Sequence, residues 1–132
     1  MWVRTRLILL LCLLACGGCG KKSTDELIED LKSPEERDRL MAVRLLQQRK
    51  GDAAQAVPAL IEALKDKEGD IRRSAAIGLG DVGEEAKDAI PALLAAKGDR
   101  DARVREAAGV ALSRIDPMRF PLPTKTQPAR KE

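Results

Sequence analysis

Residues 56–88 read AVPALIEALKDKEGDIRRSAAIGLGDVGEEAKD, and residues 89–116 repeat this pattern as AIPALLAAKGDRDARVREAAGVALSRID. Aligning residues 56–82 with residues 89–115 gives 9 identities in 27 positions. A fainter copy precedes them, because Leu27, Leu31 and Arg39 each recur 33 residues later. A repeat of this length is typical of stacked units that cannot bury their apolar faces alone.

Each unit contains two stripes of apolar residues with helical spacing. Val57, Leu60 and Leu64 lie at i, i+3 and i+7, and a second stripe begins at Ile71 and includes Leu79. A period of 3.6 residues indicates amphipathic helices and not strands. We therefore predict an all-α fold, a short α-solenoid of about three helix-pair repeats. The repeat domain should span residues 23–116, in units of about 23–55, 56–88 and 89–116.

Polar residues mark the expected starts of the helices. Ser33, Asp66 and Asp99 are 33 residues apart, and each is placed to cap the second helix of its unit. Ser23, followed by Glu26, should close a capping box on the first helix. Pro34 is expected at the first position of its helix. Two other prolines, Pro58 and Pro91, are expected in the first turn of theirs.

The second helices resemble a known family. The pattern Ile71-Arg72-x-x-Ala75-Ala76-x-x-Leu79-Gly80 with Asp66 before it, and the similar run from Val104, resemble HEAT repeats. They resemble especially the short HEAT-like type named after phycobilisome lyases. In that family the repeated Asp and Arg tie neighbouring units together. The resemblance therefore implies a ladder of Arg39, Arg72 and Arg105 with Asp66 and Asp99.

The resemblance also implies a binding surface. In this family the second helices line the concave face, which makes Asp70, Arg73, Arg103 and Glu106 candidate contacts for a partner protein. The alternative is that these four side chains are ordinary solvated charges.

The N-terminus has the form of a secretory signal, with a short cationic start and the nine-residue apolar run LILLLCLLA at residues 7–15. This run is about half the length that a bilayer-spanning helix needs.

Leu13-Leu14-Ala15-Cys16 resembles the lipobox of bacterial lipoproteins, in which the cysteine is acylated and becomes the first residue. The resemblance implies a signal peptide at residues 1–15, a lipidated Cys16 and a tether at residues 16–22. An uncleaved signal anchor and lipidation at Cys19 are the alternatives. The implied location is the bacterial cell envelope, on the periplasmic or extracytoplasmic side of a membrane.

Composition excludes several classes of function. The net charge is +3, but residues 23–116 hold 16 basic and 20 acidic residues, so the repeat domain itself is acidic. A nucleic-acid binder would concentrate positive charge and aromatic side chains on its fold, and the only aromatic residues are Trp2 and Phe120. The chain has no His, and no Cys follows Cys19, which argues against a metal site and against a nucleophile with its base.

A G-x-G-x-x-G pattern at Gly78, Gly80 and Gly83 would bind a dinucleotide only between a strand and a helix. Here a predicted helix precedes it, so we interpret these glycines as sites of close packing and of helix termination. The acidic cluster of Asp66, Glu68 and Asp70 is interpreted as a helix start and not as a metal site. No cofactor is expected.

Residues 117–132 contain four prolines and a surplus of Lys and Arg, and they are predicted to be a disordered tail. The sequence as a whole predicts a lipoprotein that is not an enzyme and that binds another protein through its repeats. Two alternatives stay open. In one the chain is an accessory module of an enzyme complex, because some relatives of this repeat type assist chromophore attachment. In the other it is a structural component of the envelope.

Overall fold

The fold is described by a computed structural model that covers residues 21–122, and this part of the chain is helical with no strand. The α-helices are α2 (Thr24–Asp30), α3 (Glu36–Gln47), α4 (Ala53–Ala63), α5 (Gly69–Val82), α6 (Ile90–Ala96) and α7 (Ala102–Ile115). Two 3-10 helices, η1 (Lys50–Asp52) and η2 (Gly83–Ala89), connect neighbouring units. The prediction of an all-α, short α-solenoid is confirmed. The proposed signal peptide with Cys16 and Cys19 lies outside the described residues.

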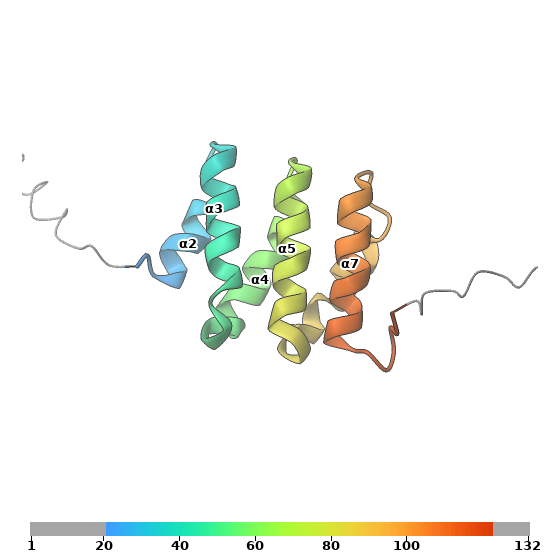
Figure 1. The fold of residues 1–132 in the computed structure, drawn as a ribbon. Coiled ribbons are helices and arrows are strands. Elements are labelled where there is room, and N and C mark those ends of the chain that lie inside the picture. Colours follow the sequence, from blue (N-terminus) through green and yellow to red (C-terminus); the bar gives the residue numbers. More distant parts are fainter. Residues whose placement is uncertain (1–20, 123–132) are drawn as a thin grey trace, which may run out of the picture.

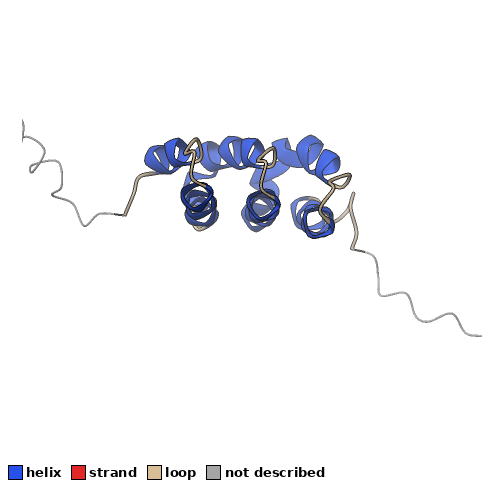
Figure 2. Cartoon of the chain, turned by 90° about the horizontal axis from the view of Figure 1, so that it is seen from above, coloured by secondary structure: helices blue, strands red, loops and turns tan. Residues whose placement is uncertain are grey.

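The helices form two layers. The second helices of the units, α3, α5 and α7, stand side by side in a row (Figure 1). The first helices, α2, α4 and α6, form the other layer, which is seen from above in Figure 2. Within the row, α5 packs against both α3 and α7. The middle unit therefore has a neighbour on each side, whereas each end unit has one.

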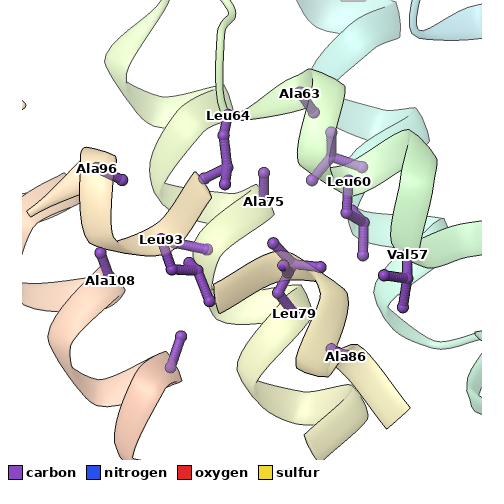
Figure 3. Close-up of a cluster of buried hydrophobic side chains, with 14 of the residues drawn as sticks. Val57, Leu60, Ala63, Leu64, Ala75, Leu79, Ala86, Leu93, Ala96 and Ala108 are labelled. Atoms are coloured by element: carbon purple, nitrogen blue, oxygen red, sulfur yellow. The ribbon is translucent and has the colours of Figure 1, made fainter. Parts of the chain in front are cut away.

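The core repeats with the sequence. Leu27, Leu60 and Leu93 are fully buried, as are their partners from the second helices, Leu46, Leu79 and Leu112. In Figure 3, Leu60, Leu79 and Leu93 gather in the space between α4, α5 and α6. Burying one such leucine contributes about 1.5–3 kcal/mol. The 33-residue period thus exists because each unit places the same side chains into one continuous core.

Small residues set the distance between the second helices. A Cβ atom built on Gly80 of α5 would lie 2.9 Å from the Cα of Ala111 in α7, so a side chain there would collide with backbone. A Cβ atom on Gly78 would lie 2.6 Å from the side-chain Cγ of Gln47 in α3, so there it would meet a side chain and not backbone. Gly83 ends α5 with a φ of 76°, in the left-handed region that favours glycine. These three glycines lie in and directly after a helix, so they do not form a dinucleotide-binding loop.

The predicted caps of the second helices are displaced by two residues. The N-cap residues of α3, α5 and α7 are Glu35, Glu68 and Asp101, and Ser33, Asp66 and Asp99 precede them. Each predicted cap accepts the N–H of the N-cap residue and not an N–H of the first helical turn. The prediction was wrong because these side chains close a turn in front of the helix. The capping box of Ser23 and Glu26 on α2, by contrast, is present.

Two of the three prolines also depart from expectation. Pro34 lies before α3, which begins at Glu36, and Pro58 lies inside α4. Helix α4 begins one turn earlier than predicted because Ala53 and Ala56 are buried against the core. The N–H that Pro58 lacks would have bonded the carbonyl of Ala54, which is an exposed residue, so water can replace this bond. Pro91 lies in the first turn of α6, as predicted.

The tail is ordered further than predicted. After α7 the chain turns, and the N–H of Phe120 donates to the carbonyl of Asp116 (2.9 Å). The Phe120 ring is partly buried against the core and lies 5.2 Å from the Arg119 guanidinium. The expectation of a disordered tail from residue 117 onward is therefore wrong as far as Phe120, because this ring covers apolar surface at the end of the stack. Residues 123–132 lie outside the described part.

Candidate functional site

Two arginines on the second helices reach across to the next unit. Arg39 donates from Nε to Asp66 Oδ2 (2.7 Å) and from Nη2 to Asp66 Oδ1 (3.2 Å). Arg72 makes the same pair of bonds to Asp99, both at 2.8 Å. The geometry is bidentate, which is the strongest form of an arginine–carboxylate contact. Each contact ties one unit to the following one.

The remaining nitrogen of each arginine binds its own unit. Nη1 of Arg39 donates to the carbonyls of Ser33 and Pro34, and Nη1 of Arg72 donates to those of Asp66 and Lys67. The side chains of Arg39 and Arg72 are each only 7% exposed. Because such nearly buried charges are costly unless every donor has an acceptor, these contacts act as fixed joints between the units.

Both carboxylates are held in the ionised form. Burial raises the pKa of Asp66, but the hydrogen bonds from Arg39 and from the Glu68 N–H outweigh this effect, and the pKa lies below its ordinary value. For Asp99 the hydrogen bond from Arg72 is the largest cause, and it lowers the pKa against the opposing effect of burial. The joints are therefore charged near neutral pH.

Arg105 lies in the equivalent position of the last unit but has no such partner. Its Nη1 donates to the carbonyls of Asp99 (2.8 Å) and Arg100 (3.2 Å), as in the other two units. No carboxylate within residues 21–122 bonds its guanidinium, and the residue is exposed. The ladder implied by the family resemblance thus has two closed rungs, at Arg39 and Arg72, and one open rung, at Arg105.

The candidate contact residues lie together on the face of α5 and α7. Arg103 of α7 forms ion pairs with Asp70 of α5 and with Asp101, each at 2.9 Å. The side chains of Arg103 and Asp70 are 57% and 55% exposed, so their ion pair contributes little to stability. Arg73 and Glu106 are also exposed. All four charges can therefore be redirected to a partner at small cost to the fold.

A groove of about 280 Å³ runs between α5 and α7 at this place. Arg73, Arg103 and Glu106 line it, as the family resemblance implied for a binding face, and Asp70 borders it through its ion pair with Arg103. The groove also has an apolar lining that we did not predict, which includes Ile77 and Val110. A charged rim around an apolar floor is a common design for a protein-binding surface.

Sequence reasoning missed Ile77, Val110 and Arg114, the last of which pairs with Asp81 across the two helices. A signal for them existed, because Ile77 lies four residues after Arg73, and Val110 lies seven after Arg103. Residues at these spacings share one face of a helix. That the two faces meet in a groove depends on the close approach of α5 and α7, which spacing within one helix does not reveal.

The remaining features of the described residues concern a possible metal site and a possible membrane span. Within residues 21–122 no group of three or more His, Cys, Asp or Glu side chains could hold a metal ion. In the acidic cluster, Asp66 bonds Arg39, and Asp70 bonds Arg103. No helix in this part is both long enough and apolar enough to cross a membrane.

Comparison with known proteins identifies the repeats. A family model of HEAT repeats matches residues 24–117. No curated protein sequence matches the chain significantly. Among solved structures, the chain is similar to one chain of the complex of CpcE and CpcF of phycocyanin lyase from Nostoc sp. PCC7120, with a TM-score of 0.65 and 30% sequence identity. The match covers 76% of this chain and 40% of that one, so this chain spans less than half the length of its relative.

Proposed function

Because the chain belongs to the HEAT-repeat family, we propose that it is a non-catalytic scaffold that binds another protein and is held on a bacterial membrane by a lipid anchor. The observation that carries the binding role is the groove between α5 and α7, with its apolar floor and exposed charges. Solenoids of this kind use the surface of their stacked helices for binding. The similar solved chain is itself part of a complex of two proteins, which supports a protein partner here.

The proposed anchor is a lipid on Cys16, which lies outside the described residues. Acyl chains contribute about 0.8 kcal/mol per buried CH₂, and a single chain binds a membrane only marginally, so stable anchoring requires more than one chain. The protein would then lie in the cell envelope, on the periplasmic or extracytoplasmic side of the membrane. Residues 16–22 would connect the anchor to the repeats.

Metabolic labelling with a palmitate analogue tests the anchor. The wild-type chain and a Cys19→Ser variant should incorporate the label and sediment with membranes, and Cys16→Ser should do neither. If Cys19→Ser alone loses the label, the site of acylation is Cys19. If all three chains remain unlabelled, the chain carries no such anchor.

Photo-crosslinking tests the binding surface. A crosslinking amino acid placed at Glu106, inside the groove, should capture one partner in fixed proportion, and Arg73→Glu should abolish the capture. The control position is Leu94, which is 43% exposed on α6 in the other layer. Equal capture from Leu94 and Glu106, or no loss with Arg73→Glu, would refute the groove as the binding surface.

One alternative has a specific observation in its favour. The similarity to a chain of a phycocyanin lyase complex supports a role as an accessory module of an enzyme complex. The same crosslinking experiment distinguishes the scaffold role from the accessory role and from a structural role in the envelope. Capture of an enzyme or of a pigment-carrying protein supports the accessory role, whereas capture of wall polymer or lipid alone supports a structural role in the envelope.

A further inference from the structure

The open rung at Arg105 is built like the two closed ones. In all three units Nη1 of the arginine donates to the carbonyls that lie six and five residues earlier, which fixes the plane of the guanidinium. At Arg39 and Arg72 the opposite edge, formed by Nε and Nη2, binds a carboxylate of the next unit. At Arg105 this edge has no acceptor within the described residues. Since the arginine is already held in place, a carboxylate would bind it with little loss of side-chain entropy.

Apolar surface lies beside this arginine. A groove of about 500 Å³ at the C-terminal end of the stack is lined by Arg105, Lys97, Val110, Leu112, Phe120 and Leu122, among others. Leu122 is 55% exposed. In the two earlier units, by contrast, a further second helix packs against α3 and against α5. Lys97 and Arg105 outnumber Glu106, the acidic side chain in the lining, so the charge balance suits an acidic occupant, and the apolar lining suits a packed helix.

We propose that this end of the stack docks a second protein, and that Arg105 binds an aspartate which that protein presents at the turn between two antiparallel helices. The model for the contact is within the chain itself, where the turn between α6 and α7 presents Asp99 to Arg72. The partner thus continues the stack across a chain boundary. This inference rests on the proposed scaffold role, but it uses a second groove, which shares Glu106 and Val110 with the groove between α5 and α7 and differs from it in containing Arg105 and not Arg73.

A second copy of this chain is not the partner, because its first unit lacks the required features. Ser33 occupies the position of Asp66 and Asp99, so no carboxylate is available there. Leu45 occupies the position of Gly78 and Ala111, which are small because a neighbouring helix approaches them closely. Within the described residues, the first unit thus lacks two features that the later units use to pack on the unit before them, whereas the last unit keeps the arginine of an internal contact.

The test converts a copy of the chain into the partner. A donor chain carries Ser33→Asp and Leu45→Ala, which create the missing aspartate and the small residue, and Arg105→Gln, which prevents it from binding itself. The acceptor is the wild-type chain. Both are purified at full length, the donor is labelled with a fluorophore, and binding is followed by microscale thermophoresis, with circular dichroism to confirm that each variant folds.

Donor and wild-type acceptor should form a one-to-one complex, whereas the donor alone and the wild-type chain alone should remain monomeric. An Arg105→Gln acceptor should bind at least about tenfold more weakly, because a bidentate charged contact is lost. Arg105→Lys should also weaken binding, because an ammonium group cannot make both bonds in the plane. If the donor fails to fold, the form with Ser33→Asp and Arg105→Gln alone replaces it.

Two results would overturn the inference: no complex between a folded donor and the wild-type acceptor, or an affinity that is the same with Arg105 and with Gln at this position. An Arg73→Ala acceptor should bind the donor normally, since Arg73 lines the other groove. Glu106 lines both grooves, so Arg73 and Arg105 distinguish them: a crosslink from Glu106 that Arg73→Glu leaves unchanged, with intact donor binding, would reject only the proposed function. The reverse pattern would reject only the docking at Arg105.

Discussion

Arg72→Ala is expected to destabilise the domain far more than the same substitution at Arg105. The side chains of Arg72 and Asp99 are 7% and 13% exposed, and the substitution removes one of them. Asp99 then keeps its hydrogen bond from the Asp101 N–H but loses both bonds to the guanidinium. Breaking a buried ion pair from one side costs about 3–5 kcal/mol. Because the carbonyls that Arg72 also binds can turn to water, we expect a value near the lower limit.

A loss of about 3 kcal/mol is large for a domain whose total stability is about 5–15 kcal/mol. At about 4–8 °C per kcal/mol for a domain of this size, the melting temperature should fall by about 12–24 °C. Arg105→Ala is the matched control, since it has the same residue type, the same helix position and the same two carbonyl contacts, but no carboxylate. It should cost no more than about 1 kcal/mol.

Thermal and urea unfolding followed by circular dichroism at 222 nm measures both effects. A double-mutant cycle of Arg72→Ala with Asp99→Ala isolates the energy of the pair itself. Equal losses for Arg72→Ala and Arg105→Ala, or a coupling energy near zero between Arg72 and Asp99, would show that the contact between units does not stabilise the stack.

Further predictions concern pH, packing and the tail. Folding lowers the pKa values of Asp66 and Asp99. Their contribution to stability is therefore complete above the ordinary carboxyl pKa of about 4, and it is lost as the pH falls through the folded-state pKa values. Unfolding curves between pH 7 and pH 2 should show this loss of stability, and the Asp99→Asn variant should lose less. Gly80→Ala should lower the melting temperature because its Cβ would meet the backbone of α7, whereas Gly109→Ala, with no atom within 4 Å of the new Cβ, should raise stability by about 0.4–1 kcal/mol in the same melting assay. Truncation before Phe120 should lower the melting temperature by a few degrees, because the ring covers part of the core, and an unchanged melt would show that this packing adds nothing.

The repeat and its core could be predicted from the sequence, because burial follows the period of the helix. Leu79 and Leu112 lie 33 residues apart and are both buried, and the same is true of Leu60 and Leu93. Apolar side chains at this spacing have one favourable solution, which is to face one another across stacked helix pairs. The N-caps could not be placed from the sequence alone, because an aspartate such as Asp66 can cap a helix or close the turn before it. In the structure Asp66 closes the turn before α5, where it accepts the Glu68 N–H and also binds Arg39.

The groove and the open rung depend on which helices become neighbours. Ile77 and Val110 line one groove because the glycine at position 80 lets α5 and α7 approach, and no pattern within either helix contains the distance between them. Arg72 and Arg105 stand in the same local motif, so their sequences predict the same contact for both. They differ because a following unit supplies a carboxylate to Arg72, and the described chain supplies none to Arg105. Local sequence determines how each arginine is held, and position in the stack determines what it binds, because an ion pair needs both of its partners in space.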